Sequence, residues 1–304
     1  MNVGIIGNGN HSKRIQEILI RKKILFTIYK PNNKKYYNKT ELAELKKNNI
    51  IFIVSPNKTH FNYIKELSKN RYIFCEKTPV SNQTEINKLK KLNNGTIYFN
   101  YNFRFSKISE IIKNNYNLGK LIYGNITITH GLALKNDYRS NWRSNKKKCP
   151  KGVFEMVSIH WIDFINFHYE IKKIDKPFLL NHSKVGTSYD TSHTKILLKN
   201  NGLINIFTSY NAPLSNKILL IFENGVIEQN EENIIIRGPS LNLDKNNHFK
   251  KPKLIKKYNL KEENDYKISL TKSVDFFLKQ SAKKIKFEKK LFNCSVKSNE
   301  LLFD

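Results

Sequence analysis

Short apolar segments alternate with amphipathic segments over the first hundred residues of the chain. The apolar segments span residues 2–7, 25–30, 50–55, 72–77 and 96–101. The segments between them have the apolar spacing of helices and lie near residues 12–22, 40–48, 58–70 and 82–92. Strands that are apolar throughout and separated by helices are typical of a parallel sheet covered on both faces. The pattern predicts an N-terminal α/β domain.

The pattern changes after about residue 118, where apolar and polar residues begin to alternate as in strands that bury one face. The alternating segments are residues 122–131, 194–200, 203–211 and 217–224. Helices are expected at residues 153–169 and 268–280, and the Lys- and Asn-rich stretch 240–266 is expected to be a loop. We therefore predict a second α/β domain, residues 118–304, with a large, mostly antiparallel, open sheet.

Residue types that cap helices precede two of the predicted N-terminal helices. Thr40 is the expected N-cap of one helix, and Ser81 or Asn82 of another. Glu85 follows Asn82 by three residues, which is the spacing of a capping box. This spacing predicts a well-defined start for the helix near residues 82–92.

A glycine-rich turn lies directly between the first predicted strand and the first predicted helix. In that position glycines let the backbone approach a pyrophosphate, and the helix N-terminus faces the phosphates. A purely structural turn is the alternative, and Ser12 replaces the third glycine of the usual GxGxxG pattern. We predict that residues 1–117 form a Rossmann domain that binds a dinucleotide. The binding residues expected from this turn are Gly7, Gly9, Asn10, His11 and Ser12.

The end of the second predicted strand bears on which dinucleotide is bound. Domains that bind NAD usually carry an acidic residue there, which bonds the ribose hydroxyls. This chain has Lys30 at that place, Lys34 and Lys35 follow, and the first acidic residue is Glu41. We expect NAD(P) as the cofactor and favour NADP(H), with Lys30 beside the 2′-phosphate. The alternative is that these lysines only reflect the general composition.

The composition is strongly basic, with 54 Lys and Arg residues against 25 Asp and Glu and a formal net charge of +29. Such a charge can indicate nucleic-acid binding. However, seven of the basic residues are Arg, the lysines are spread along the chain, and Asn, Ile, Phe and Tyr are also abundant. These residue types have A/T-rich codons, and no zinc-finger or RNA-binding signature occurs. We expect no nucleic-acid partner and keep nucleic-acid binding as an alternative.

The cysteines and the apolar segments exclude further classes. Cys75, Cys149 and Cys294 are widely separated, which fits a reducing compartment and no disulfide framework. His130, His168, His182 and His193 have no metal-ligand spacing, so no metal is expected. No apolar run approaches the roughly 18 residues of a membrane span, and no signal peptide is evident. We expect a cytoplasmic protein without a membrane partner.

Polar residues end the third and fourth predicted strands. Because the carboxyl ends of parallel strands meet at one edge of a sheet, where open α/β sheets bind ligands, we expect these residues to border the cofactor. The predicted residues are Ser55, Pro56, Asn57, His60, Glu76 and Lys77. Lys77 is the predicted catalytic residue, and a solvated turn is the structural alternative. His60 is expected to pack or cap at the rim of the cofactor site.

These motifs resemble those of the Gfo/Idh/MocA oxidoreductases, the glucose–fructose oxidoreductase and inositol dehydrogenase family. Members have one strand that ends in Pro-Asn with a histidine just beyond, and a later strand that ends in Glu-Lys-Pro. Three further segments resemble family segments in the same order, so that the resemblance covers most of the chain. They are NYNFRF at 100–105, LGKLIYGNITIT at 118–129 and WRSNKKKCPKGVFEMVSIHWIDFINF at 142–167.

The resemblance implies hydride transfer between a nicotinamide cofactor and a hydroxyl or ketone of a sugar, sugar acid, polyol or sugar nucleotide. Lys77 and His160 would handle the proton, since an unperturbed histidine titrates near pH 6.5. The resemblance also implies a homo-oligomer, either a dimer or a tetramer. The implied substrate-binding residues are Tyr101, Arg104, Trp142, Arg143, Glu155 and Asp163.

Two positions depart from the family pattern. Thr78 follows Lys77, where the family has a proline that usually forms a cis peptide bond. Met156 occupies the position four residues before His160, where the family has an acid, and Glu155 is about 100° away around an α-helix. These departures suggest an alternative, in which the chain binds a dinucleotide without catalysis and acts as a regulator or partner subunit.

Overall fold

The computed structural model describes residues 2–30, 39–92, 95–114, 116–239, 243–260 and 265–303. The chain divides into two compact units. Unit 1 contains Met1–Phe105 and Ser269–Asp304, and unit 2 contains Ser106–Ile268. The chain passes from unit 1 to unit 2 between Phe105 and Ser106 and returns to unit 1 at Ser269. Each unit is described by itself.

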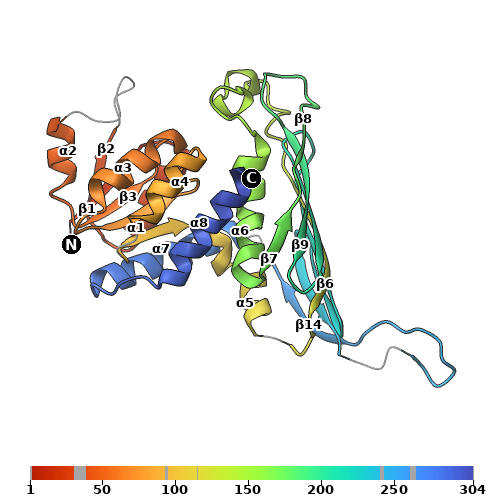
Figure 1. Ribbon diagram of the computed structural model, residues 1–304. Helices are drawn as coiled ribbons and strands as arrows, with labels where there is room; N and C mark the ends of the chain where they lie inside the picture. Colours follow the sequence, from red (N-terminus) through yellow and green to blue (C-terminus); the bar gives the residue numbers. More distant parts are fainter. Residues whose placement is uncertain are drawn as a thin grey trace. The chain divides into compact units, whose positions relative to one another are not determined.

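Unit 1 is built on a five-stranded parallel sheet with strand order β2-β1-β3-β4-β5 (Figure 1). The strands are β1 (Val3–Ile6), β2 (Phe26–Tyr29), β3 (Ile50–Ile53), β4 (Tyr72–Glu76) and β5 (Ile97–Asn100). The helices between them are α1 (Asn10–Arg21), α2 (Lys39–Leu45), α3 (His60–Leu67) and α4 (Gln83–Lys90). All residues of β1, β3 and β5 are buried, as expected for a sheet covered on both faces. The predicted α/β fold with a Rossmann-type sheet is confirmed.

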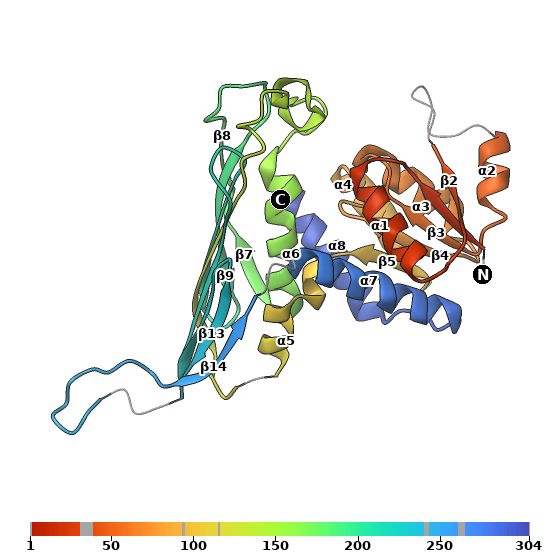
Figure 2. The same cartoon turned by 180° about the vertical axis from the view of Figure 1, so that it is seen from behind.

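Two C-terminal helices complete unit 1, α7 (Asp265–Ala282) and α8 (Lys289–Phe303). The Phe277 ring lies 5.2 Å from the Phe52 ring and 5.3 Å from the Phe74 ring, both edge-on. On α8, the Phe292 ring lies 5.4 Å from Phe99. Both views show α7 alongside the parallel sheet (Figures 1 and 2). A helix at 268–280 was predicted, but as part of the second domain, and α8 was not predicted.

Unit 2 is built on a nine-stranded sheet with the order β14-β13-β12-β11-β6-β10-β9-β7, in which β8 pairs with β9. The pairing is antiparallel except between β6 and β10. Its first strands are β6 (Leu121–Thr129), β7 (Ile171–Ile174), β8 (Phe178–Leu180), β9 (Thr191–Leu198) and β10 (Leu203–Ser209). The remaining strands are β11 (Ser215–Phe222), β12 (Gly225–Gln229), β13 (Asn233–Arg237) and β14 (Leu254–Asn259). The predicted large, mostly antiparallel sheet is confirmed.

One face of this sheet packs against helix α6 (Ile159–His168), as both views show (Figures 1 and 2). Ile126 of β6 pairs in register with Ile206 of β10 and Ile218 of β11, and all three are buried. A short helix, α5 (Lys107–Lys113), precedes the sheet in the chain and was not predicted.

The stretch expected to be a loop, residues 240–266, contains strand β14, so that expectation is partly wrong. β14 pairs with β13 at the edge of the sheet, and most of its side chains are exposed. Lysines are common on edge strands because they discourage pairing with other chains. Because of its Lys-rich composition, this strand was not predicted from the sequence. Residues 240–242 and 261–264 lie outside the described residues.

Candidate functional site

The glycine-rich turn of unit 1 connects β1 to α1 and has the geometry of a phosphate cradle. Gly7 has φ +110°, and a Cβ there would lie 2.6 Å from the carbonyl oxygen of Val54. Gly9 is the N-cap of α1, has no side-chain cap bond, and a Cβ there would meet nothing within 4 Å. The first turn of α1 contains no acidic residue. The space beside Gly9 and the uncapped helix terminus therefore fit an anionic group.

Ser12 replaces the third glycine without disturbing the turn. It is fully buried, and its Oγ donates a hydrogen bond of 2.9 Å to the carbonyl oxygen of Gly7. Gln16 Nε2 donates in turn to Ser12 Oγ at 3.0 Å and to Asn8 Oδ1 at 3.3 Å. These bonds hold the turn against α1. Asn10 is the exposed first residue of α1.

The second strand ends beside the same turn, since the amide of Gly7 donates to the carbonyl oxygen of Tyr29 at 2.8 Å. Lys30 follows and is exposed. Pro31, Lys34 and Lys35 lie outside the described residues. Lys30 is thus placed next to the cradle, and its predicted contact with a 2′-phosphate stays a prediction.

His60 joins the ends of two neighbouring strands. Its Nε2 lies 2.7 Å from the carbonyl oxygen of Ser55, just after β3. Its Nδ1 lies 2.8 Å from the carbonyl oxygen of Thr78, just after β4. The side chain is fully buried, and this burial lowers the pKa of His60 below its usual value. His60 is therefore placed to hold the backbone around Lys77, as expected for a residue that packs at the rim of the site.

The segment after β3 carries the other predicted cofactor residues. Ser55 is buried, and its Oγ lies 2.5 Å from Thr59 Oγ1. Pro56 precedes a short 3-10 turn, Asn57–Thr59. Asn57 Nδ2 donates to Thr78 Oγ1 at 3.4 Å. This segment is therefore linked to the residue that follows Lys77 by the side chain of Asn57 as well as by His60.

Glu76 is the centre of a buried polar group at the end of β4. Its Oε1 lies 2.7 Å from His11 Nε2, and Asn100 Nδ2 donates to the same oxygen at 2.7 Å. Burial opposes ionisation, but His11 and Asn100 together hold the pKa of the Glu76 carboxyl below its usual value. The glycine turn is thereby fixed to the end of β4. Sequence reasoning missed Asn100, although its place at the end of β5 was available as a signal.

Lys77 follows Glu76 at this edge of the sheet and is buried to 9% exposure. The peptide bond between Lys77 and Thr78 is cis. A lysine that is 9% exposed does not lie in a solvated turn.

Tyr101 and Arg104 have partners within unit 1. Asn299 Nδ2 of α8 donates to Tyr101 Oη at 2.8 Å. Arg104 is 3% exposed, its Nη2 donates to Ser295 Oγ at 2.9 Å, and its guanidinium lies 5.2 Å from the centre of the Tyr101 ring. Both side chains therefore hold α8 in place, and their predicted contact with substrate stays a prediction.

In unit 2, the helix that carries His160 begins with a π-helical turn, Phe154–Ser158. The amide of Ile159 donates to the carbonyl oxygen of Phe154, five residues earlier. Such a turn holds one residue more than an α-helical turn. A residue five positions before His160 therefore takes the face that a residue four positions before it would take in an α-helix. The π turn thus changes the helical face on which Glu155 lies relative to His160.

The other predicted residues of unit 2 lie around this helix. His160 is half-buried, and Glu155 Oε1 accepts a hydrogen bond of 3.1 Å from the amide of Lys151. Asp163 is buried within α6. The guanidinium of Arg143 lies 4.5 Å from the centre of the Trp142 ring.

Neither a metal site nor a membrane-spanning helix is found in the part of the chain that the structure describes. There, no group of three or more His, Cys, Asp or Glu side chains is arranged to hold a metal ion. Within the same ranges, no helix combines the length and the apolar character needed to cross a bilayer.

No protein-family model and no curated protein sequence matches the chain. Solved structures do match it over almost its whole length. Levoglucosan dehydrogenase in complex with NADH has a TM-score of 0.81 at 13% sequence identity, covering 99% of this chain and 96% of that one. An oxidoreductase from Agrobacterium radiobacter in complex with NAD⁺, L-tartaric acid and magnesium has a TM-score of 0.78 at 12% identity, covering 99% and 94%. A dehydrogenase from Clostridium difficile has a TM-score of 0.72 at 18% identity, covering 99% and 97%.

At these identities the similarity establishes the fold. The chain has the two-sheet architecture of these oxidoreductases, two of which have NADH or NAD⁺ bound.

Proposed function

We propose that the chain is an NAD(P)-dependent oxidoreductase of the Gfo/Idh/MocA type that acts on a hydroxyl or ketone of a carbohydrate-like substrate. The observation that carries the proposal is the open cradle at Gly9, tied through His11 and Glu76 to the strand end that bears Lys77. The structural neighbours support it, because they include a levoglucosan dehydrogenase with bound NADH and levoglucosan and an oxidoreductase with bound NAD⁺ and L-tartaric acid.

The residues of unit 1 fit the phosphates of a dinucleotide. Gly9 leaves space for the pyrophosphate, and the amides of the first turn of α1 would donate to it. Lys30 would favour NADP(H) through the 2′-phosphate, because no acidic residue lies there to bond a free ribose hydroxyl. When bound, the nicotinamide supplies or accepts the hydride.

Lys77 and His160 are the proposed proton-handling residues. A buried ammonium group can donate a hydrogen bond to the reacting oxygen of the substrate, which favours negative charge on that oxygen. A half-buried histidine can take or return the proton near neutral pH. Glu155 would orient His160 and stabilise its charged form.

The test is a fluorescence titration with NADH and NADPH, followed by a turnover panel of sugars, sugar acids, polyols and sugar nucleotides. We expect one nucleotide to bind with a Kd below about 1 mM, the upper end of usual substrate constants. We expect Lys77→Ala to lower turnover by roughly 10²- to 10⁴-fold, the usual contribution of a general acid or base. Lys58→Ala, at an exposed lysine after β3, is the matched control. If neither nucleotide binds, the proposal is wrong.

The departures at Thr78 and Met156 leave one alternative of a different class, a dinucleotide-binding regulator or partner subunit. In that case the wild-type protein binds the nucleotide but converts no member of the panel. Lys77→Ala then binds the nucleotide as well as the wild type does. Turnover by the wild type excludes this alternative.

We also propose a homo-oligomer formed through the uncovered face of the nine-stranded sheet. Leu219 of β11 pairs with Asn125 on one side and Glu228 on the other, and Glu228 pairs with Ile235. These residues lie on the face opposite the buried Ile218, and the apolar side chains of Leu219 and Ile235 are half-exposed there. Covering this face with a second copy would remove the apolar surface from water. Light scattering tests this, and Leu219→Lys should shift the population to monomer.

A further inference from the structure

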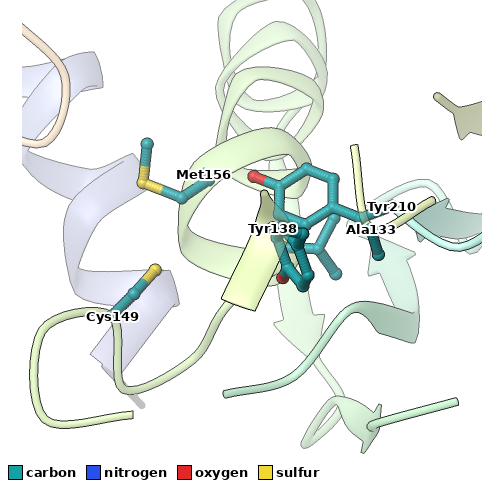
Figure 3. Packing of buried hydrophobic residues seen from close by; sticks show 6 residues of the cluster. Ala133, Tyr138, Cys149, Met156 and Tyr210 are labelled. Carbon is teal, nitrogen blue, oxygen red and sulfur yellow. The ribbon is translucent and has the colours of Figure 1, made fainter. Parts of the chain in front are cut away.

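A cluster of buried side chains lies where the loop after β6 folds over the π turn of unit 2. Its members are Ala133, Tyr138, Cys149, Val153, Met156 and Tyr210, with Trp142 packed at its side. Figure 3 shows the rings of Tyr138 and Tyr210 side by side next to Ala133, and the Met156 side chain nearby. The two ring centres are 6.4 Å apart and the rings meet edge-on. Most of the cluster is apolar, but several of its polar groups lack an evident structural role.

The hydroxyl of Tyr138 is the first of these groups. The side chain is 1% exposed, and within the described residues its hydroxyl has no hydrogen-bond partner. The carboxylate of Asp190 is engaged elsewhere, because its two oxygens accept from the amides of His182 and Ser183 and from Thr191 Oγ1. Buried hydroxyls are nearly always paired in native proteins. An unpaired one at a cluster of this kind therefore points to a ligand.

The guanidinium of Arg143 is the second. It is half-buried over the Trp142 ring, and no acceptor among the described residues hydrogen-bonds it. The Trp142 ring in turn packs against the cluster that contains Tyr138 and Tyr210, so the cation lies at the side of this cluster. The carboxylate of Glu155 is engaged by the amide of Lys151. The positive charge of Arg143 is therefore not compensated by an ion pair.

His130 supplies a third polar group. Its ring centre lies 4.9 Å from that of Tyr210. Burial, followed by the charge of Arg143, lowers the pKa of His130, so that the imidazole is neutral at physiological pH. The cluster thus combines one cation with neutral hydrogen-bonding groups.

We propose that Arg143, with the hydroxyl of Tyr138, binds a negatively charged group of the substrate, a carboxylate or a phosphate. A planar guanidinium presents paired N–H groups that match the two oxygens of either anion. The stacked Trp142 ring holds the plane of the guanidinium in one orientation. An uncharged sugar would leave the cation uncompensated. The inference rests on the proposed function, since it names the substrate class of that oxidoreductase.

The test compares three sugars of similar size by calorimetric titration: D-glucose, D-glucuronate and D-glucose 6-phosphate. Hydrogen bonds to charged groups predict that one of the two anionic sugars binds roughly 10- to 100-fold more tightly than glucose. A preference for glucuronate identifies a carboxylate site, and a preference for the phosphate ester identifies a phosphate site. Glucose binding as tightly as both anionic sugars overturns the proposal, and so does the absence of binding by both anionic sugars.

Two variants separate recognition from folding. Arg143→Met should abolish the preference for the anionic sugar, whereas Arg139→Met, at an exposed arginine four residues earlier, should keep it. Tyr138→Phe removes the unpaired hydroxyl without changing the ring. It should weaken the binding of the anionic sugar roughly 3- to 10-fold. The Tm should stay equal or rise, because a buried unpaired hydroxyl is itself destabilising. If Arg143→Met weakens the binding of glucose and of the anionic sugar by the same factor, the proposal is wrong.

The titrations are repeated with and without the nucleotide. The oxidoreductase proposal and the assignment of Arg143 are thereby tested independently. Loss of nucleotide binding contradicts the oxidoreductase proposal, and the preference between glucose and the anionic sugars remains measurable in unit 2. Nucleotide binding without a preference for anions contradicts only the assignment of Arg143.

Discussion

At the level of single residues, His60 shows how one buried side chain can fix a reactive segment. It has no route to solvent, and its two nitrogens face carbonyl oxygens of two different strand ends. One of those carbonyls belongs to Thr78, next to Lys77. The side chain therefore links stability and the placement of Lys77.

This role predicts a pH dependence of stability. Because burial lowers the pKa of His60 in the folded chain, the unfolded chain binds the proton more readily below about pH 6.5. The free energy of unfolding is thus fully retained above that pH and falls as the pH decreases. We expect His60→Gln to cost about 1–3 kcal/mol at neutral pH and to lose less stability between pH 7.5 and about pH 5. Urea unfolding measures both quantities.

His182→Gln, at an exposed histidine, is the control and should keep the wild-type pH dependence. Glu76 does not contribute to the pH dependence measured above about pH 5. Its lowered pKa changes the free energy of unfolding only below 4.5, the ordinary pKa of a glutamate. If His60→Gln keeps the full pH dependence, another group is responsible for it.

The two glycines of the cradle should respond differently to substitution. Gly9 has open space and an ordinary φ of −78°, so Gly9→Val should change stability by less than about 0.5 kcal/mol. Its side chain would fill the cradle, and nucleotide affinity should fall at least about tenfold, or 1.4 kcal/mol. Gly7→Ala instead clashes with the Val54 carbonyl and should destabilise the fold by about 1–3 kcal/mol. Thermal unfolding and NADH titration distinguish the two variants. If Gly9→Val binds NADH as tightly as the wild type does, the phosphates do not bind beside Gly9.

At the level of elements, the start of α4 and the π turn show what local sequence can and cannot reveal. Asn82 caps α4 by accepting from the amide of Glu85, as predicted, but Glu85 Oε2 accepts from the amide of Ser81, one residue before the N-cap, rather than from that of Asn82 as in a capping box. Thr40 lies inside the first turn of α2 and is not its N-cap. Capping depends on neighbours in sequence, whereas the π turn depends on how the helix packs in unit 2. For that reason the register of Glu155 was not predictable from spacing alone.

The π turn leads to a prediction about the position of the acid. Glu155→Gln should lower turnover by roughly 10- to 100-fold with nucleotide affinity unchanged, since a carboxylate that orients a histidine acts on proton transfer. Moving the acid by one residue, in the double variant Glu155→Met with Met156→Glu, should not restore activity. It should also destabilise unit 2, because position 156 is 8% exposed among apolar side chains. Activity in the double variant would show that residue 156 is the functional position.

At the level of the whole molecule, both sheets could be predicted because each has a distinct hydrophobic period. The unbroken apolar strands predicted the parallel sheet, and the alternating strands predicted the antiparallel one. The assignment of α7 and α8 to unit 1 could not be predicted, since it depends on contacts of Phe277 with Phe52 and of Phe292 with Phe99, which are 225 and 193 residues apart in the chain. Likewise, Tyr138 belongs to no local motif and packs beside Tyr210 only through the fold of its loop.

The division into two units predicts how the chain unfolds. Phe292 of α8 packs on Phe99 and is 4% exposed, so Phe292→Ala should cost about 3–5 kcal/mol in unit 1. Phe249→Ala, at a ring 92% exposed in unit 2, should cost less than about 0.5 kcal/mol. In calorimetry, Phe292→Ala should lower one transition, and that same transition should rise when the nucleotide is added, because a ligand stabilises the part that binds it. If the nucleotide raises a different transition, α8 does not belong to the nucleotide-binding unit.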